Sequence, residues 1–173
     1  MVNRYIRSLA VSVAIILSFS VLAADATRIQ LVAHIPIAPP AEPSLLSATA
    51  TSSALQSGAV SGAGSAALAV DGSLSSRWES QHGLDPSWLI LDLGANYTLS
   101  EVIIKWEAAN AASYRIDGSL DGTNWTNSLA TFSGGTWNPG AGVRRTDTLA
   151  LSGSYRYVRM YGISRPVGNY YGY

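Results

Sequence analysis

Beyond residue 66, apolar and polar residues alternate with a period of two, which is the period of β-strands. The clearest segment is Trp88–Leu93, in which apolar residues occupy both faces, so this strand is expected to be buried. The same pattern predicts strands over residues 102–106, 114–119, 145–151 and 155–161. Residues 48–53 resemble an opening strand, with disorder of this stretch of small and polar residues as the alternative. No long helical period accompanies them, so the chain is predicted to be an all-β sandwich or barrel, with strand order left open.

Turn signals separate the predicted strands. Asp121-Gly122 is a strong hairpin signal after the strand over residues 114–119, and Trp125 begins the returning strand. Residues 131–142 are rich in Gly and contain a Pro, which predicts a loop, and residues 56–65 predict a flexible loop of small and polar residues.

Residues 1–26 have the organisation of a secretory signal peptide. Arg4 and Arg7 supply a basic start, and the apolar run that follows is short for a membrane span. Cleavage is expected after Ala23, with Ala26 as the alternative, and an uncleaved anchor is the competing interpretation. A cleaved signal places the mature chain outside the cytoplasm, either secreted or periplasmic.

A tether is predicted over residues 27–47. Several prolines stand there among Ala, Ile and Leu, and proline at this density disfavours both helix and central strand. The remaining residues, 48–173, are long enough for one domain.

Composition and charge narrow the class of protein. The 173 residues include 11 basic and 11 acidic ones, and loss of the signal's two arginines leaves a slightly acidic domain, so nucleic acid is not an expected partner. There is no cysteine, so the exported domain must rest on its core without disulfides. Of the tryptophans, Trp78, Trp88 and Trp106 lie in or beside apolar strands, and at least two are expected in that core.

The sequence offers little for catalysis. Glycoside hydrolysis needs two carboxylates about 5–10 Å apart across a cleft, whereas the acidic residues here are scattered over turns and strand ends. His34 lies in the tether, so His82 is the only histidine of the domain and cannot complete a Ser/His/Asp set or a histidine metal site. We therefore expect a binding domain and not an enzyme.

Five segments read AVDGSLSSRW, DPSWLILDLG, IIKWEAANAASYRI, SLDGTNWT and YRYVRMYGISRPVGNYYGY. Together they resemble the coagulation factor 5/8 type C (discoidin) domain, and within it the bacterial family 32 carbohydrate-binding modules, from about Ser47 onwards. The resemblance implies an antiparallel jelly-roll β-sandwich of the galactose-binding-like type. Animal members usually carry a disulfide, which this chain lacks, and this favours the sugar-binding bacterial branch.

One departure from the family pattern concerns the end of the chain. In the family, a Gly-Tyr dipeptide is followed by a last strand beside the first, whereas this sequence stops at Tyr173. The resemblance therefore implies a C-terminal truncation of about ten residues, which leaves an unpaired sheet edge and a partly open core of marginal stability. It also implies that the preceding tyrosines hang from a loose end.

The resemblance further implies a structural calcium site. The matching positions are the Asp71 carboxylate, the Ser76 hydroxyl or carbonyl, and the main-chain oxygens of Leu68 and Ser73. Calcium takes about six to eight oxygens, and a tight loop presents several at once. The family's second carboxylate belongs to the absent last strand, so the site is expected to be incomplete. The competing interpretation is that Asp71 only starts an Asp-Gly turn and bonds its own backbone.

A sugar site in the loops at one end of the sandwich is also implied. Arg77, His82 and Glu107 match its polar positions, and such groups read sugar hydroxyls through charge-assisted hydrogen bonds. Each has an alternative: an ion pair of Arg77 with Glu79 or Asp85, simple solvation of His82, and strand-end capping by Glu107. A carboxylate at position 107 also favours an amino sugar, as in relatives that bind chitosan-like polymers.

Aromatic side chains complete the expected site, because a ring face packs against the C–H side of a sugar. Tyr170 or Tyr171 is predicted to be the stacking platform, and Trp137 is the next candidate. We therefore predict a monomeric, non-catalytic, extracellular module that binds a polysaccharide or glycan, does not insert into membranes after signal cleavage, and forms part of a larger secreted glycan-active protein. The alternatives are an adhesion module that binds protein or membrane, and a degenerate remnant without a ligand.

Overall fold

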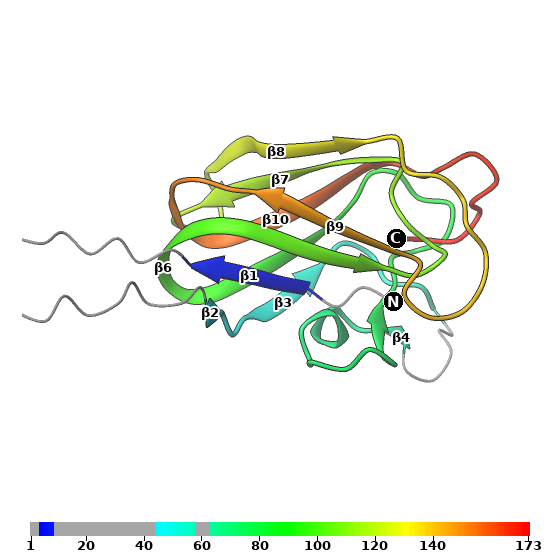
Figure 1. The fold of residues 1–173 in the computed structure, drawn as a ribbon, viewed down its shortest axis with the longest axis horizontal. Coiled ribbons are helices and arrows are strands. Elements are labelled where there is room, and N and C mark those ends of the chain that lie inside the picture. The colour runs from blue at the N-terminus through cyan, green and yellow to red at the C-terminus, as the bar shows by residue number, and fades with distance from the viewer. Residues whose placement is uncertain (1–3, 9–43, 58–62) are drawn as a thin grey trace, which may run out of the picture.

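The computed structural model describes residues 4–8, 44–57 and 63–173, which form the all-β sandwich that the sequence predicts (Figure 1). The predicted signal and tether lie largely outside these residues and stay predictions. Within the described part of the chain, no helix is long and apolar enough to cross a membrane. The elements are β1 (Arg4–Ser8), β2 (Ser44–Leu45), β3 (Thr49–Ser52), β4 (Ala63–Gly64), a 3₁₀ turn (Ala66–Ala69), β5 (Arg77–Trp78), β6 (Ser87–Trp106), β7 (Ser113–Ser119), β8 (Trp125–Ser133), β9 (Arg145–Ala150) and β10 (Ser154–Ser164).

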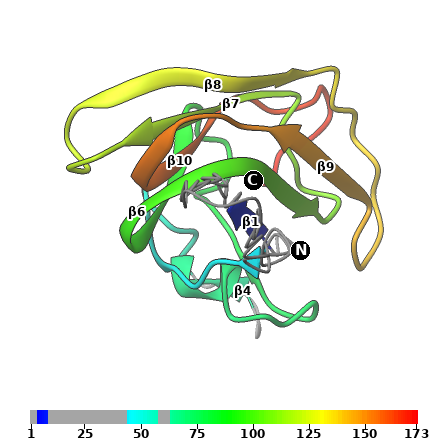
Figure 2. The ribbon, with the colours of Figure 1, turned by 60° about the vertical axis from the view of Figure 1, so that its left-hand side comes forward.

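The long strand β6 joins the two sheets of the sandwich. Its first half pairs with β10 and β3, and its second half pairs with β9 and β1. Gly94 lies between the halves with a φ of +81°, a backbone conformation that glycine adopts without steric cost. Its N–H donates to Asp92 Oδ1 at 2.8 Å. The two strands predicted over residues 88–93 and 102–106 are therefore one strand that curls from one sheet into the other (Figure 2).

The larger sheet has the order β3, β6, β10, β7, β8. Its predicted hairpin joins β7 to β8, and Gly122 in the turn has a φ of +76°. Asp121 Oδ1 accepts hydrogen bonds from the N–H groups of Asn124 and Thr123, each at 2.8 Å. These bonds, those from Asn124 above all, hold the pKa of the Asp121 carboxyl well below its ordinary value. The β8 strand runs to Ser133, into the segment predicted as a loop.

Large aromatic side chains form much of the core between the sheets. Trp78 and Trp106 are fully buried, which confirms that at least two of the three candidate tryptophans belong to the core, and Trp88 is partly buried. The Trp106 ring nitrogen and the Tyr114 hydroxyl both donate to Asp147 Oδ2, at 2.7 and 2.8 Å. A buried carboxylate is tolerated here because hydrogen bonds replace its contacts with water.

The C-terminal segment packs against the sandwich. Tyr173 is 1% exposed and belongs to the core, with its ring against Gly162 of β10, where an added Cβ would lie 2.7 Å from Cζ. Its N–H donates to Ser80 Oγ at 3.0 Å, and its hydroxyl donates to Asp85. The expectation of a loose end is therefore wrong, because Tyr173 supplies a buried ring and two hydrogen bonds.

Strand β1 falls within the segment predicted as a signal peptide. It pairs antiparallel with β6, from Arg4 opposite Ile104 to Ser8 opposite Leu99, and with β2 on its other side. Among the described residues, β3 pairs with β6 alone and so forms an edge of the larger sheet. Whether a further strand belongs beside it, as the resemblance implies, stays a prediction.

Removal of the predicted signal peptide takes β1 away from β6. In a chain that begins at Ala24, we expect those amides of residues 100–104 that face β1 to exchange with solvent on the order of tenfold faster than in the full-length chain, because they lose hydrogen-bond partners. Hydrogen–deuterium exchange checks this, with residues 87–93, held between β3 and β10, as the internal control. Equal exchange in both chains would show that β1 does not protect this strand.

The buried Tyr173 predicts a loss of stability at high pH. Burial, and then the hydrogen bond to Asp85, raise the pKa of the Tyr173 hydroxyl above its ordinary value. Above about pH 10 an unfolded tyrosine ionises while the folded one keeps its proton, so the free energy of unfolding falls as pH rises. In chemical denaturation above that pH, this fall is expected to be steeper by up to about 1.4 kcal/mol per pH unit than in Tyr173→Phe. Parallel profiles for the two proteins would contradict the assignment.

Candidate functional site

Segments that are far apart in the sequence meet at one end of the sandwich (Figure 1, right). They are β5 with the turn after it, the residues after β6, the loop between β8 and β9, and the segment after β10. These segments carry every residue predicted for the sugar site, namely Arg77, His82, Glu107, Trp137, Tyr170 and Tyr171.

A continuous line of charged and polar side chains forms one part of the site, and we call it the charged line. Arg77 Nε lies 3.3 Å from Glu107 Oε2, and Arg77 Nη2 lies 3.5 Å from Glu79 Oε2. The other carboxylate oxygen, Glu79 Oε1, lies 2.5 Å from His82 Nε2. The line therefore runs Glu107, Arg77, Glu79, His82, and each side chain keeps between 11% and 24% of its exposure to solvent.

The hydrogen bond to Glu79 fixes the tautomer of His82. A carboxylate only accepts hydrogen bonds, so the proton of the neutral imidazole lies on Nε2. Nδ1 is then an acceptor in the neutral ring. The imidazole can thus accept a hydrogen bond from a ligand on one side while its other nitrogen is held by the protein.

Three aromatic residues, Trp137, Tyr170 and Tyr171, form the second part of the site, which we call the aromatic wall. The ring centroids of Tyr171 and Tyr170 lie 5.2 and 6.2 Å from that of His82, both in edge-on geometry. Trp137 stacks on Tyr171 at 5.9 Å with an interplanar angle of 23°. Tyr170 and Tyr171 are 74% and 49% exposed, so their rings are open to solvent, and Trp137 lies against Tyr171.

The loop that carries His82 is tied down through its main chain. The His82 N–H donates to Gln56 Oε1 at 2.8 Å, and the Gly83 N–H donates to the Tyr170 carbonyl at 3.1 Å. Gly83 has a φ of +73°, which lets the chain turn back toward the wall. The second of these bonds joins the two parts of the site directly.

The structure decides between the alternatives considered for Arg77. It pairs with Glu79, and also with Glu107, so the ion-pair interpretation holds together with the expected clustering. The alternative partner Asp85 is wrong, because its carboxylate bonds Arg165. Glu79 is the site residue that the sequence analysis considered only as a partner of Arg77. Its position between Arg77 and His82 in the sequence is the signal that could have identified it.

The predicted calcium residues are only partly brought together. Asp71 Oδ1 accepts from the Ser73 N–H at 2.8 Å, and Oδ2 accepts from the Ser76 hydroxyl at 2.5 Å. Leu68 lies in the 3₁₀ turn, and its N–H donates to the Ser65 carbonyl at 3.1 Å. Among the described residues, no group of three or more His, Cys, Asp or Glu side chains could hold a metal ion. The self-bonded Asp-Gly turn is present, and whether an ion adds to it stays a prediction.

Comparison with known proteins identifies the family that this chain matches. The F5/8 type C domain family matches residues 47–172. Chitosan-binding module 1 of a chitosanase/glucanase from Paenibacillus sp. IK-5 is 38% identical, with a TM-score of 0.60 over 74% of this chain and 89% of that module. Module 2 of the same enzyme, solved with chitotriose, is 29% identical, with a TM-score of 0.60 over 74% and 91% of the two chains.

More distant structures share the fold alone. A family 32 carbohydrate-binding module from Clostridium perfringens, solved with GalNAc-β-1,3-galactose, is 18% identical. Its TM-score is 0.58 over 71% of this chain and 88% of that one. No curated protein matches the chain by sequence. The antiparallel jelly-roll expectation is confirmed.

Proposed function

This chain belongs to the F5/8 type C domain family, and we propose that it is a non-catalytic carbohydrate-binding module of an exported protein. The observation that supports this most is the site itself, in which a charged line ends against an exposed aromatic wall. Sugars offer hydroxyl groups on their edges and C–H groups on their faces. A surface that binds them needs both polar groups and rings, and this end of the sandwich supplies both.

The ion pairs of Arg77 are loose enough to admit a ligand. Its distances to the two carboxylates, 3.3 and 3.5 Å, exceed the roughly 2.7–2.9 Å of a strong charge-assisted hydrogen bond. A sugar hydroxyl that reaches Arg77 can therefore accept a hydrogen bond from guanidinium N–H groups that the two carboxylates engage only weakly. Glu107 and the neutral His82 ring can accept from further hydroxyls.

We propose an amino sugar as the ligand class. One guanidinium faces two carboxylates, so the charged line is negative when His82 is neutral. A protonated amine on a sugar ring is attracted to this excess charge, whereas a carboxylate-bearing sugar is repelled. Chitosan-binding module 1 of the Paenibacillus enzyme, at 38% identity, supports the same class.

Binding without catalysis is supported by how the acidic residues are used. Asp85 and Asp92 are held by Arg165 and Arg156, and Arg156 keeps the pKa of the Asp92 carboxyl below its ordinary value. A general acid in glycoside hydrolysis needs a raised pKa. The two carboxylates of the charged line, Glu79 and Glu107, both pair with Arg77, and this arrangement fixes the positions of the charged groups.

Export and membership of a larger protein complete the proposal. The sequence of residues 1–26 supports a signal peptide, and the absence of cysteine agrees with a module that relies on its core. The Paenibacillus modules derive from a chitosanase/glucanase, which supports a role in holding a glycan-active enzyme near its substrate. We expect the module to act as a monomer.

Calorimetric titration with chitotriose tests the proposed ligand class. We expect a dissociation constant between micromolar and millimolar, or roughly 4–8 kcal/mol, and weaker binding of the N-acetylated trimer, which lacks the positive charge. Glu107→Gln should weaken chitotriose binding on the order of tenfold, since a charge-assisted contact is lost, and should change binding of the N-acetylated trimer far less. Arg77→Ala should abolish both, and Trp137→Ala should retain measurable binding.

A matched control for this experiment lies on β6, the strand that ends just before Glu107. Glu101 of β6 stands opposite Ala150 of β9, outside the charged line, so Glu101→Gln removes one carboxylate without touching the site. It should bind chitotriose like the unaltered protein. Equal losses in Glu101→Gln and Glu107→Gln would indicate a general charge effect. A glycan array on which the unaltered protein binds nothing would overturn the proposed function.

We also propose a structural calcium ion at the Asp71 turn, supported by the convergence of Asp71, Ser73 and Ser76. The Asp71 carboxylate and the Ser76 hydroxyl or carbonyl would supply part of the about six to eight oxygens that calcium takes, and the main-chain oxygens of Leu68 and Ser73 would supply others. The residues fit a weak site better than a tight one, because a single formal charge faces the ion.

Titration with calcium chloride tests this site. We expect binding heat and a higher melting temperature with calcium, since an ion that binds only the folded state stabilises it. Asp71→Asn should lose both effects. Asp121→Asn, which alters the other Asp-Gly turn, is the matched control and should keep them. An unaltered protein that gives no heat would remove calcium from the proposal.

A further inference from the structure

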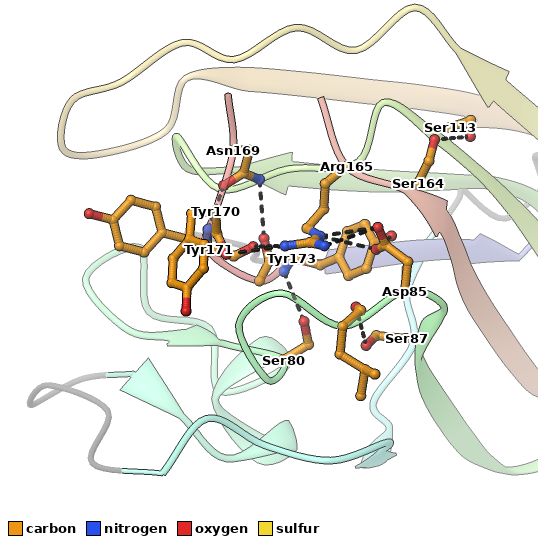
Figure 3. A network of polar contacts seen from close by, with 12 residues as sticks. Ser80, Asp85, Ser87, Ser113, Ser164, Arg165, Asn169, Tyr170, Tyr171 and Tyr173 are labelled. Carbon is orange, nitrogen blue, oxygen red and sulfur yellow. Dashed lines mark hydrogen bonds and ion pairs between the residues drawn. The ribbon is translucent and has the colours of Figure 1, made fainter. Parts of the chain in front are cut away.

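We propose that Arg165 is a positioning residue of the carbohydrate site, because its guanidinium holds the aromatic wall to the loop that carries His82 (Figure 3). The inference rests on the proposed function and extends it to a residue that contacts the wall from behind. Arg165 directly follows β10, and its side chain is 13% exposed. It therefore acts on the ligand through other residues.

The guanidinium bonds in two directions. Toward the loop after β5, Nε lies 3.1 and 3.2 Å from the two oxygens of Asp85, and Nη2 lies 3.1 Å from Oδ2. Toward the wall, Nη1 donates to the carbonyl oxygens of Tyr170 and Tyr171, each at 3.1 Å. One side chain thus joins the carboxylate of one loop to two successive main-chain carbonyls of the other.

Further hydrogen bonds connect the same two segments, the loop after β5 and the segment after β10; we call this connection the joint. The Tyr173 hydroxyl donates to Asp85, and the Tyr173 N–H donates to Ser80 Oγ at 3.0 Å. The Tyr171 N–H donates to Asn169 Oδ1 at 3.0 Å. Figure 3 shows Arg165 at the centre of these contacts, between Asp85 and the carbonyl side of the wall.

The wall needs this support because its rings are not held by the core. Tyr170 and Tyr171 expose 74% and 49% of their surface, so little apolar burial fixes their positions. Between the buried residues Asn169 and Tyr173, these two exposed residues can open locally at low cost in free energy. Sugar binding needs the Tyr171 ring beside His82, at 5.2 Å, so any opening subtracts from the population that can bind.

Arginine suits this role where lysine does not. The planar guanidinium directs donors along three different lines, and here Nε and Nη2 face Asp85 while Nη1 faces the carbonyls. A lysine ammonium keeps the charge but cannot match the carboxylate fork and the two carbonyls together. Arg165→Lys therefore removes the bridge while retaining the ion pair with Asp85.

The test compares Arg165→Lys with Arg156→Lys in the full-length chain. Arg156 lies on β10 and bonds both oxygens of Asp92, at 2.8 and 2.9 Å, so this variant makes the same replacement at a carboxylate fork away from the site. Titration with chitotriose is expected to show on the order of tenfold weaker binding for Arg165→Lys, the loss that follows if the wall is in place about a tenth of the time. Arg156→Lys should bind unchanged.

Hydrogen–deuterium exchange reports whether the segment that carries the aromatic wall has opened. In Arg165→Lys we expect faster exchange at the amides of Tyr171 and Tyr173, with the β7 amides of residues 114–118 unaffected. Asp85→Asn, a second variant that keeps the shape of the side chain, should shift affinity and exchange in the same direction. Thermal melts confirm that each variant is folded.

Each outcome decides the matter. Weaker binding and faster local exchange in Arg165→Lys, with Arg156→Lys unchanged, support positioning. Unchanged binding in Arg165→Lys overturns it, and so do equal losses in Arg165→Lys and Arg156→Lys, which would mean that stability sets affinity. If the unaltered chain binds no sugar, the proposed function fails, but exchange still tests whether Arg165 holds the wall segment in place. Faster exchange at Tyr171 and Tyr173 in Arg165→Lys supports this role, and unchanged exchange overturns it.

Discussion

The path of β6 through both sheets is the constraint on which the rest of the structure depends. Because each strand must follow the pleat of its neighbour, the register of β6 sets β10 and β3 along one half and β9 along the other. The strand curls at Gly94, so its two ends return to the same end of the sandwich. Asp85 stands just before β6 and Glu107 just after it, and both reach the binding end for this reason.

Most strands could be predicted from the sequence because their side chains alternate and their turns carry Asp-Gly or Gly signals. The continuity of β6 could not, since residues 94–98 lack an apolar pattern and their conformation depends on two different partner strands. The packing of Tyr173 was missed for a similar reason: its pocket is made by Gly162 and Ser80, and no local pattern reports such distant neighbours. The residues predicted for the site do come together at one end of the sandwich, while Glu79 and Arg165 could be identified only from the structure because their roles are contacts with other side chains and carbonyls.

The two parts of the site are supported in different ways. The charged line holds itself, since each member pairs with the next, and its distances leave capacity for a ligand. The aromatic wall depends on hydrogen bonds to its main chain, which leave the tyrosine rings open to solvent. Polar recognition is therefore built into β5 and the end of β6, whereas the stacking surface depends on the segment after β10.

The joint between Asp85 and Arg165 spans 80 positions of the sequence, and that between Ser80 and Tyr173 spans 93. Contacts between residues so far apart in the sequence form late, because a long loop must close, at a cost in conformational entropy, before these hydrogen bonds can form. The ligand surface thus exists only on molecules that have finished folding. A ligand that binds only this assembled surface would, through mass action, favour completed chains and hold them in that state.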